Sequence, residues 1–220
     1  MHITPTAEAA MFLTLRLRMV DAQLRARGIK DECVLDAMAR VPRHEFTAER
    51  YRDQAYEDYP LPIGEGQTIS QPYIVALMLE ALALRPADRV LEVGTGSGYV
   101  TALLSQVAAQ VVSIERLPAL ADDAASLLAR LGCTNVKAIV GDGSRGFPAD
   151  APYDAIVVSA AASEVPSALL AQLAEGGRMI IPVGSFDAQQ LQLIQVRNGR
   201  PQTQLREPCR FVPLVTEDRS

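Results

Sequence analysis

A glycine-rich loop follows a short apolar run near the middle of the chain. Residues 91–99 read LEVGTGSGY, which places glycines at positions 94, 96 and 98. Glycine lets a backbone turn tightly and approach a ligand that a Cβ atom would repel. A helix is expected to begin at the end of this loop, and its N-terminus adds free N–H groups and positive potential. We therefore expect Gly94, Gly96 and Gly98 to bind a cofactor.

The spacing of these glycines distinguishes two classes of cofactor. A dinucleotide-binding loop has the pattern G-x-G-x-x-G, whose third glycine would fall at position 99, where this chain has Tyr99. A nicotinamide-dependent oxidoreductase is therefore disfavoured. Here the loop begins with Glu92 and reads E-x-G-x-G-x-G, which resembles the loop of S-adenosylmethionine-dependent enzymes.

Two acidic residues follow the loop at the ends of the next two expected strands. Glu115 lies about 20 residues after Gly94, the separation at which an acid accepts hydrogen bonds from a ribose diol. Asp142 closes the following strand, just before Gly143, and can accept a hydrogen bond from the exocyclic amine of adenine. Each acid also has a simpler interpretation. Glu115 can be a solvated strand end, and Asp142 can serve only to form a turn.

The order of the expected elements indicates an α/β fold. Apolar runs predict strands at residues 89–93, 111–114, 136–140, 155–158 and 178–181. Helical patterns precede and separate them, at residues 72–84, 98–107, 117–131 and 166–173. This alternation predicts a doubly wound, mostly parallel sheet of the Rossmann-like type, with ligands beyond the carboxyl ends of its strands. Residues 191–196 and 204–214 flank an Asn-Gly pair and predict an antiparallel hairpin at one edge.

The first 70 residues are expected to form a helical cap on this core. Apolar residues recur at helical spacing from position 7 to position 27, and Gly28 is suited to end that helix. Asp31 can cap a second helix over residues 32–40. Residues 43–70 contain several prolines and glycines and are expected to be irregular. We expect a single domain, with a substrate-side cap at 1–70 and a cofactor-binding core at 71–220.

Composition and charge disfavour several other classes of protein. The 220 residues are 49% hydrophobic and 21% charged, as in an ordinary globular domain. The net charge of −5 argues against a nucleic-acid partner, although arginines cluster near the N-terminus at positions 16, 18, 25 and 27. That cluster is either a solvated helix face or a modest basic patch facing peptide or RNA. No apolar run reaches the ~18–20 residues of a membrane span, and no secretory signal is recognised. A cytoplasmic monomer is expected.

Cysteine and histidine usage narrows the possible chemistry. Cys33, Cys133 and Cys209 are far apart, so neither a disulfide framework nor a paired metal site is expected. Cys33 and Cys133 are expected to be small buried hydrophobes. With two histidines in the chain, neither a metal site nor a histidine-based triad is expected. Residues 141–146 approach the serine-hydrolase pattern G-x-S-x-G, but Asp142 replaces its first glycine.

A segment upstream of the glycine loop carries the most specific resemblance. Residues 60–72 read PLPIGEGQTISQP, and residues 41–44 read VPRH. Together with residues 92–99, these segments resemble the protein-L-isoaspartate O-methyltransferase family, and the similarity spans nearly the whole chain. The resemblance implies methyl transfer from S-adenosyl-L-methionine to the carboxylate of L-isoaspartyl residues, and less readily D-aspartyl residues, in damaged proteins and peptides. The ester then closes to a succinimide, whose hydrolysis returns some normal aspartate.

The resemblance also implies roles for individual residues. Ser70 corresponds to the active-site serine, and Thr68 belongs to the same wall. The residues that correspond to cofactor contacts are Thr68, Glu92, Glu115, Asp142 and Gly143. The chemistry is consistent with these residue types, because an isoaspartyl carboxylate is already ionised at neutral pH and needs positioning rather than a base. Ser70 can donate a hydrogen bond to that carboxylate. Alternatively, it only caps the helix that starts at Pro72.

This chain also departs from the family pattern. Residues 159–163 read SAAAS where family members often have TAAPP, and the missing prolines are expected to loosen this loop. Val100 replaces a common glutamine, and Ser144 a frequent aromatic residue. Residues 211–214 are expected either to wall a peptide site or to form a buried edge strand. Two alternatives stay open: a methyltransferase acting on another carboxylate or a small molecule, and a non-catalytic module that binds the cofactor or a peptide.

Overall fold

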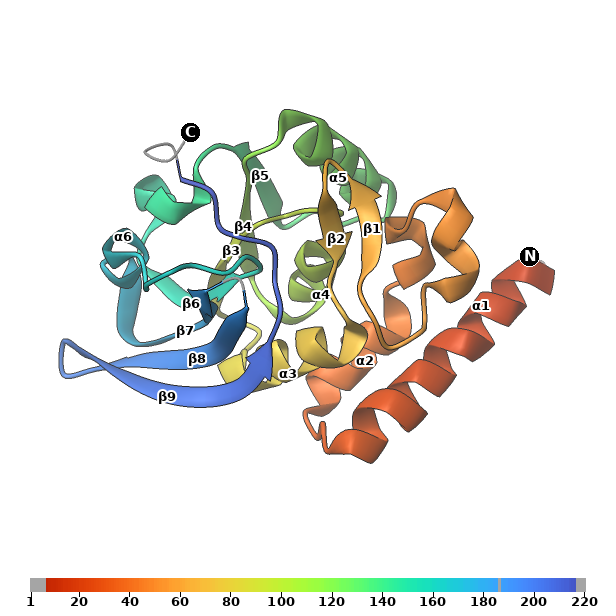
Figure 1. The fold of residues 1–220 in the computed structure, drawn as a ribbon, viewed down its shortest axis with the longest axis horizontal. Helices are drawn as coiled ribbons and strands as arrows, with labels where there is room; N and C mark the ends of the chain where they lie inside the picture. Colours follow the sequence, from red (N-terminus) through yellow and green to blue (C-terminus); the bar gives the residue numbers. More distant parts are fainter. Residues whose placement is uncertain (1–6, 186, 217–220) are drawn as a thin grey trace.

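A seven-stranded sheet forms the centre of the molecule (Figure 1). The computed structural model describes residues 7–185 and 187–216. The strand order is β5-β4-β3-β6-β7-β8-β9. Neighbours are parallel from β5 to β7, and β8 and β9 add an antiparallel hairpin. The strands are β3 (Arg89–Val93), β4 (Gln110–Glu115), β5 (Val136–Val140), β6 (Tyr153–Val158), β7 (Leu173–Ser185), β8 (Ala188–Arg197) and β9 (Arg200–Cys209). The predicted α/β fold class is confirmed.

Side chains that alternate along the strands face two separate apolar clusters. Val90 of β3 and Val157 of β6 belong to the cluster that also contains the N-terminal helices. Their neighbours Leu91 and Val158 point to the opposite face and pack with Leu169. The helices are α3 (Pro72–Leu82), α4 (Tyr99–Val107), α5 (Pro118–Arg130) and α6 (Ser167–Leu170). A sheet buried on both faces explains why its central strands are apolar throughout.

Helix α6 is shorter than the 166–173 segment that the sequence predicts. It ends at Leu170, and β7 begins at Leu173. The carbonyl of Gln172 accepts a hydrogen bond from the backbone N–H of Tyr153 at 2.8 Å, so the chain has already joined the sheet at that point. Pairing with β6 therefore replaces the last helical turn.

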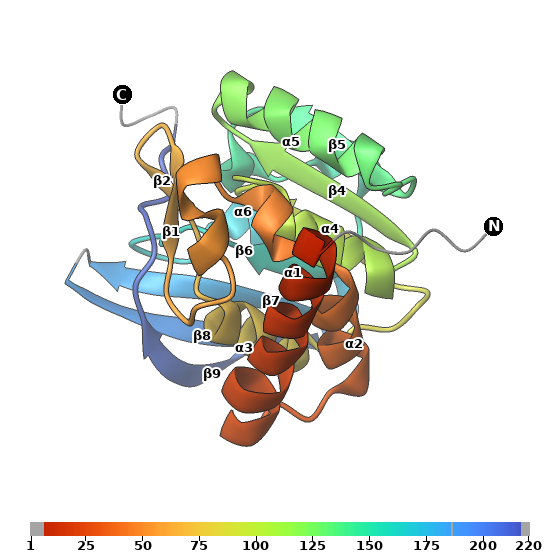
Figure 2. The same ribbon diagram turned by 90° about the vertical axis from the view of Figure 1, so that its right-hand side faces the viewer.

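The α-helices of the N-terminal cap, which the structure describes from residue 7 to residue 70, are α1 (Ala7–Arg18) and α2 (Glu32–Arg40), and they lie on the outer side of α3 and α4 (Figure 2). The expected helix over 7–27 continues past α1 as a π-helical turn and then a 3₁₀ turn, and Gly28 ends it at φ 99°. Asp31 caps α2 as predicted, because its side chain accepts hydrogen bonds from Cys33 N and Val34 N.

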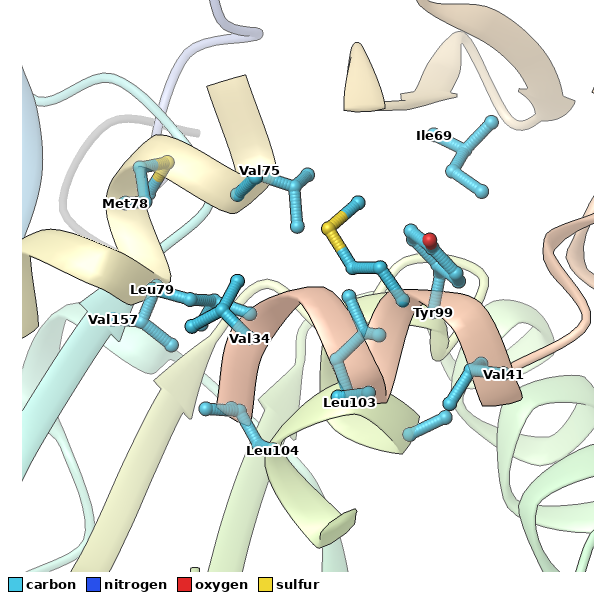
Figure 3. Packing of buried hydrophobic residues seen from close by; sticks show 14 of the residues in the cluster. Val34, Val41, Ile69, Val75, Met78, Leu79, Tyr99, Leu103, Leu104 and Val157 are labelled. Atoms are coloured by element: carbon cyan, nitrogen blue, oxygen red, sulfur yellow. The ribbon is translucent and has the colours of Figure 1, made fainter. Parts of the chain in front are cut away.

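Apolar side chains join the cap to the α/β core without a break. Figure 3 shows Val34 and Val41, at the two ends of α2, among Leu79 of α3 and Leu103 of α4. All four side chains are at most 5% exposed. Burying a Val or Leu side chain stabilises a fold by about 1.5–3 kcal/mol. The cap is therefore part of one continuous core.

The segment from residue 43 to residue 70 is more ordered than the sequence suggests. It contains two 3₁₀ helices, Arg43–Phe46 and Glu49–Gln54. It then forms a two-stranded antiparallel sheet from β1 (Leu61–Gly64) and β2 (Gln67–Ile69). The expectation of an irregular segment is wrong for this hairpin, whose turn is made by Gly64, Glu65 and Gly66, all at positive φ.

The C-terminal hairpin turns at Asn198 and Gly199, both at positive φ as the Asn-Gly pair predicts. Its last strand covers Arg200–Cys209 rather than residues 204–214. The Gln189 side chain explains this end point, because it accepts from Phe211 N at 2.6 Å and donates to Phe211 O at 3.0 Å. The chain is thereby turned away from the sheet after Cys209.

Two cysteines are less buried than the sequence predicts. Cys33 is exposed and Cys133 only half-buried, so the prediction that both are buried is wrong. Cys33 lies in the first turn of α2, where its backbone N–H donates a hydrogen bond to the side chain of Asp31 and its thiol stays exposed. Across residues 7–185 and 187–216, each helix is too short or too polar to cross a membrane.

Candidate active site

A cavity opens at the carboxyl ends of β3, β4 and β6. The strand order reverses at β3, since β4 and β5 lie to one side of it and β6 and β7 to the other. Ligands bind at such a switch point in open α/β sheets. The wall of the cavity includes residues 94–97 of the glycine loop, but not Gly98, together with Glu115, Gly143, residues 67–70 and residues 212–215. Segments far apart in the sequence therefore meet where a ligand is expected.

The glycine loop is held by backbone hydrogen bonds to the neighbouring strand. The N–H groups of Gly94 and Thr95 both donate to the carbonyl of Ile114, at 2.8 and 3.3 Å. Gly94 has φ 91°, a backbone conformation that residues with a Cβ atom rarely adopt. At Gly98, a Cβ atom would lie 3.3 Å from Ala124, so glycine also allows α4 to pack closely on α5. The loop thus places the N-terminus of α4 at the cavity.

Glu115 is fixed at the end of β4 by two backbone N–H groups. Its Oε2 accepts from Gly96 N at 2.8 Å, and its Oε1 accepts from Leu117 N at 3.0 Å. The residue is 8% exposed, so the alternative of a solvated strand end is wrong. Each carboxylate oxygen has a further lone pair, and the two can together receive a pair of vicinal hydroxyl groups.

Asp142 and Gly143 lie at the end of β5, and only Gly143 is part of the cavity wall. The side chain of Asp142 is 3% exposed, and its Oδ1 accepts from Ser144 N at 2.9 Å and from Ser144 Oγ at 2.7 Å. The structure therefore shows the turn-forming role of Asp142. Glycine is required next to it, because a Cβ atom at position 143 would lie 2.5 Å from Val93 Cγ1. A contact between Asp142 and adenine stays a prediction.

Glu92 lies beneath the glycine loop and away from the cavity wall. Its Oε2 accepts hydrogen bonds from Thr101 Oγ1 at 2.5 Å and Ser113 Oγ at 2.7 Å. Ser113 Oγ is in turn 2.6 Å from the hydroxyl of Thr95, which does line the cavity. Glu92 is fully buried, and this burial raises its pKa to about 7. The structure thus links Glu92 to the loop through Ser113 rather than placing it in the cavity.

Ser70 lies between β2 and α3 and lines the cavity together with Thr68. Within the part of the chain that the structure describes, its hydroxyl group has no hydrogen-bond partner. Gln71 occupies the N-cap position of α3 without capping it through its side chain. The carboxylate of Asp58 instead accepts from Tyr73 N at 3.1 Å. The alternative that Ser70 serves to cap α3 is therefore wrong.

The loop at residues 159–163 is tied on both sides. Ala161 N donates to Val212 O at 2.8 Å, and Leu214 N donates to Ala161 O at 2.7 Å. On its other side, Ala162 N donates to Pro182 O at 3.0 Å. These backbone bonds anchor the loop, and its loosening relative to a TAAPP loop stays a prediction. They also bring residues 212–215 to the cavity, so this segment is a wall of the site and not an edge strand.

Sequence reasoning missed several residues that the structure places at the site. Ser159 follows β6 and lines the cavity, and its N–H donates to Val93 O at 2.8 Å. Its position at a strand end was an available signal. Arg116 and Glu65 also line the cavity, at the end of β4 and in the β1–β2 turn. For Glu65 the available signal is its place within residues 60–72, the segment that carries the most specific resemblance.

The cavity suits a nucleoside that carries a charged tail. The glycine loop offers a concave backbone surface, and at Gly96 a Cβ atom would already contact Ile63 at 3.4 Å. Glu115 provides paired acceptors for a ribose, and the N-terminus of α4 favours a carboxylate. S-adenosylmethionine combines a ribose, an adenine and an amino-acid tail, so these residues fit it. Among the described residues, no group of histidine, cysteine and acidic side chains is arranged to hold a metal ion.

Comparison with known proteins identifies the family. Residues 16–219 match the family described as Protein-L-isoaspartate(D-aspartate) O-methyltransferase (PCMT). A protein-L-isoaspartate O-methyltransferase from Koribacter versatilis (strain Ellin345) is 58% identical over 200 residues, which cover 91% of this chain and 90% of the relative.

Two solved structures agree with this match. A protein-L-isoaspartate O-methyltransferase superposes with a TM-score of 0.82 at 33% identity, and the match covers 90% of this chain but 65% of that longer chain. A putative enzyme of this kind from Plasmodium falciparum, solved in complex with S-adenosyl-L-homocysteine, superposes with a TM-score of 0.80 at 30% identity, over 91% of this chain and 98% of the other. This chain belongs to the protein-L-isoaspartate(D-aspartate) O-methyltransferase family.

Proposed function

We propose that the protein transfers the methyl group of S-adenosyl-L-methionine to the carboxylate of L-isoaspartyl residues in damaged proteins and peptides. One observation carries this proposal: the hydroxyl group of Ser70, which takes no part in capping α3, lines the same cavity as the glycine loop and Glu115. An acceptor and a methyl donor can therefore meet there. Membership of the family supports the substrate class.

The reaction needs positioning rather than acid–base chemistry. An isoaspartyl carboxylate is ionised at neutral pH, so one of its oxygens is already a nucleophile. S-adenosylmethionine supplies a methyl group on a positively charged sulfur. The carboxylate oxygen forms a bond to that carbon as the carbon–sulfur bond breaks, and the sulfur keeps the electron pair in S-adenosylhomocysteine. No proton moves in this step, and none of the described residues that line the cavity is a histidine.

Each wall residue has a defined part in this proposal. Ser70 donates a hydrogen bond to the acceptor carboxylate and aligns its second oxygen with the methyl carbon. The N-terminus of α3, directly after Ser70, favours the negative charge. The glycine loop, Glu115 and Gly143 hold the cofactor, with Asp142 as the acceptor for the adenine amine. Thr68 lies on the Ser70 side of the same cavity.

Four finer statements belong to this proposal as expectations. D-aspartyl residues are expected to be poorer acceptors, because their inverted Cα shifts the carboxylate relative to Ser70. The monomeric state, the cytoplasmic location and the absence of a nucleic-acid partner stay predictions from the sequence. The arginine cluster supports the last of these. Arg25 pairs with Glu32 and Arg27 pairs with Asp58, which leaves less free positive charge than the sequence suggests.

A direct test uses S-adenosylmethionine labelled on its methyl group and two peptides that differ only in isoaspartate versus aspartate. Base-labile label on the isoaspartyl peptide alone is the expected result. Label on neither peptide, with the cofactor still bound in calorimetry, would contradict the proposed acceptor. Label on both peptides would contradict the proposed selectivity. An S-adenosylhomocysteine competition experiment serves as the control for specific binding.

A further inference from the structure

Asp58 joins three segments of the chain next to Ser70. Its Oδ1 accepts from Tyr73 N at 3.1 Å, and its Oδ2 accepts from Gln71 Nε2 at 2.8 Å. Its backbone carbonyl accepts from the same Gln71 nitrogen at 3.0 Å. The guanidinium group of Arg27 also bonds to Oδ2. One carboxylate from the cap thus accepts hydrogen bonds from three groups, which belong to two other segments.

These bonds hold the backbone immediately after Ser70. Gln71 is the next residue, and its carbonyl accepts the first helical hydrogen bond of α3 from Val75 N at 3.1 Å. Tyr73 donates its N–H to Asp58 two positions later. Because Asp58 supplies the cap of α3 from outside the helix, the Ser70 hydroxyl is available to the cavity.

Arg27 makes this arrangement compatible with an anionic acceptor. A lone carboxylate near the start of α3 would offset the positive potential of the helix N-terminus. Arg27 pairs with that carboxylate, and its guanidinium carbon lies 3.5 Å from the centre of the Tyr73 ring. The Asp58 side chain is 21% exposed, so this ion pair is partly shielded from water. The acceptor end of the cavity therefore keeps its affinity for negative charge.

We infer that Asp58 is a positioning residue for the methyl transfer, which acts by orienting Ser70. This inference rests on the proposed function and deepens it. It also assigns a task to the N-terminal cap, which supplies both Asp58 and Arg27. Asp58 itself is absent from the cavity wall and is expected to touch neither the cofactor nor the acceptor.

The test is a double-mutant cycle with Ser70. In Asp58→Asn, the remaining oxygen still accepts from Tyr73 N, but the new NH₂ group cannot accept from Gln71 or Arg27. We expect kcat on the isoaspartyl peptide to fall about 10-fold, in line with a displaced hydrogen bond to a charged group, and the cofactor Kd to change less than about twofold. In a Ser70→Ala background, Asp58→Asn should cost almost nothing further.

The cycle separates positioning from general stability. An equal loss of kcat in both backgrounds would overturn the inference, because a structural role does not depend on the Ser70 hydroxyl. Asp36→Asn is the matched control, since it removes another ion pair of the cap, with Arg40, and neither residue lines the cavity. It should leave kcat and the cofactor Kd unchanged. Thermal unfolding of each variant confirms that it is folded.

A second readout does not require methyl transfer. Amide hydrogen exchange in residues 70–74 should be faster in Asp58→Asn than in the wild type, and unchanged in Asp36→Asn. Equal exchange in all three proteins would also overturn the inference. If the wild-type protein fails to methylate the isoaspartyl peptide, the proposed function fails by that result alone, whereas the exchange data still decide whether Asp58 holds this segment.

Discussion

The two walls of the cavity are built in different ways. On the cofactor wall, the loop after β3 is fixed by its own backbone, through the bonds of Gly94 N and Thr95 N to Ile114 O. On the proposed acceptor wall, the backbone directly after Ser70 is held by a side chain from a distant segment, because Asp58 accepts from Gln71 Nε2 and Tyr73 N. The first wall depends on local conformation, and the second depends on the cap remaining docked to the core.

This difference predicts separable effects of mutation. A change on the cofactor wall should alter the affinity for S-adenosylmethionine, whereas a change on the acceptor wall should alter the rate of transfer once the cofactor is bound. Uniform loss of binding raises KM, while loss of an interaction made in the transition state lowers kcat. Three substitutions test how sharply the two walls are divided, and a fourth, at Glu92, tests the support beneath the cofactor wall.

Glu115→Ala should have the largest effect. It removes the proposed acceptor for the ribose and leaves Gly96 N and Leu117 N without the carboxylate that they bond to. Two or more hydrogen bonds to a charged group are worth about 4 kcal/mol, which corresponds to roughly a 1000-fold weaker Kd for the cofactor. Titration calorimetry measures this change.

The control for Glu115→Ala is Asp122→Ala, which removes the same charge from the exposed surface of α5. It should leave the cofactor affinity unchanged. If Glu115→Ala lowers kcat at saturating cofactor without changing Kd, then Glu115 acts on the acceptor and the division into two walls is wrong.

Glu92→Gln tests the support beneath the cofactor wall through its pH dependence. Burial raises the folded-state pKa of Glu92 from 4.5 to about 7. The unfolded chain therefore ionises first, so Glu92 lowers the stability of the wild type as pH rises from about 4.5 to 7, by about 3 kcal/mol in total, with a plateau above pH 7. A neutral glutamine contributes no such slope.

Urea unfolding of both proteins at several pH values from 4.5 to 8 measures this effect. We expect the difference in unfolding free energy, Glu92→Gln minus wild type, to become more positive across this range. A constant difference would mean that Glu92 is already ionised in the folded protein, with its charge balanced by the Thr101 and Ser113 hydroxyls.

Ser70→Ala should affect the acceptor wall alone. Loss of one hydrogen bond to a carboxylate costs about 2 kcal/mol, which corresponds to roughly a 30-fold lower kcat. The cofactor Kd should stay within about twofold, because the Ser70 hydroxyl is expected to contact the acceptor and not the nucleoside. Single-turnover assays with the isoaspartyl peptide measure the transfer step, and Ser126→Ala on the exposed side of α5 is the control.

The sequence predicts the cofactor wall better than the acceptor wall, and the reason is physical. Glycines at 94, 96 and 98 and the acid at 115 occupy strand ends, and parallel strands bring their carboxyl ends to one edge of a sheet. Alternating strands and helices therefore locate this wall without any knowledge of tertiary contacts.

The acceptor wall depends on contacts that no local pattern encodes. Nothing near Asp58 in the sequence indicates that its carboxylate caps a helix that begins at Pro72. The range predicted for the last strand, β9, is wrong for a similar reason. The Gln189 side chain forms hydrogen bonds with the backbone of Phe211, which takes the place of sheet pairing there. Helix α6 is one turn shorter than predicted, because pairing of β7 with β6 outweighs the local helical preference.

Asp142→Asn should have the smallest effect of the four substitutions. Asp142 stabilises a local turn, as on the cofactor wall, but it does so through a side chain, as Asp58 does on the acceptor wall. Its Oδ1 closes a local turn by accepting from Ser144 N and Ser144 Oγ, and asparagine can retain these bonds. If the adenine amine bonds to the second oxygen, asparagine replaces that acceptor with a donor, and the cofactor Kd should weaken by about 1 kcal/mol, or roughly 5–10-fold. An unchanged Kd in calorimetry would mean that Asp142 acts only as a turn former.

Ser144→Ala separates the two cases further, because it removes a competing hydrogen bond while keeping the carboxylate. It should leave the cofactor affinity equal or stronger if Asp142 receives the adenine, and weaker if the turn alone shapes the site.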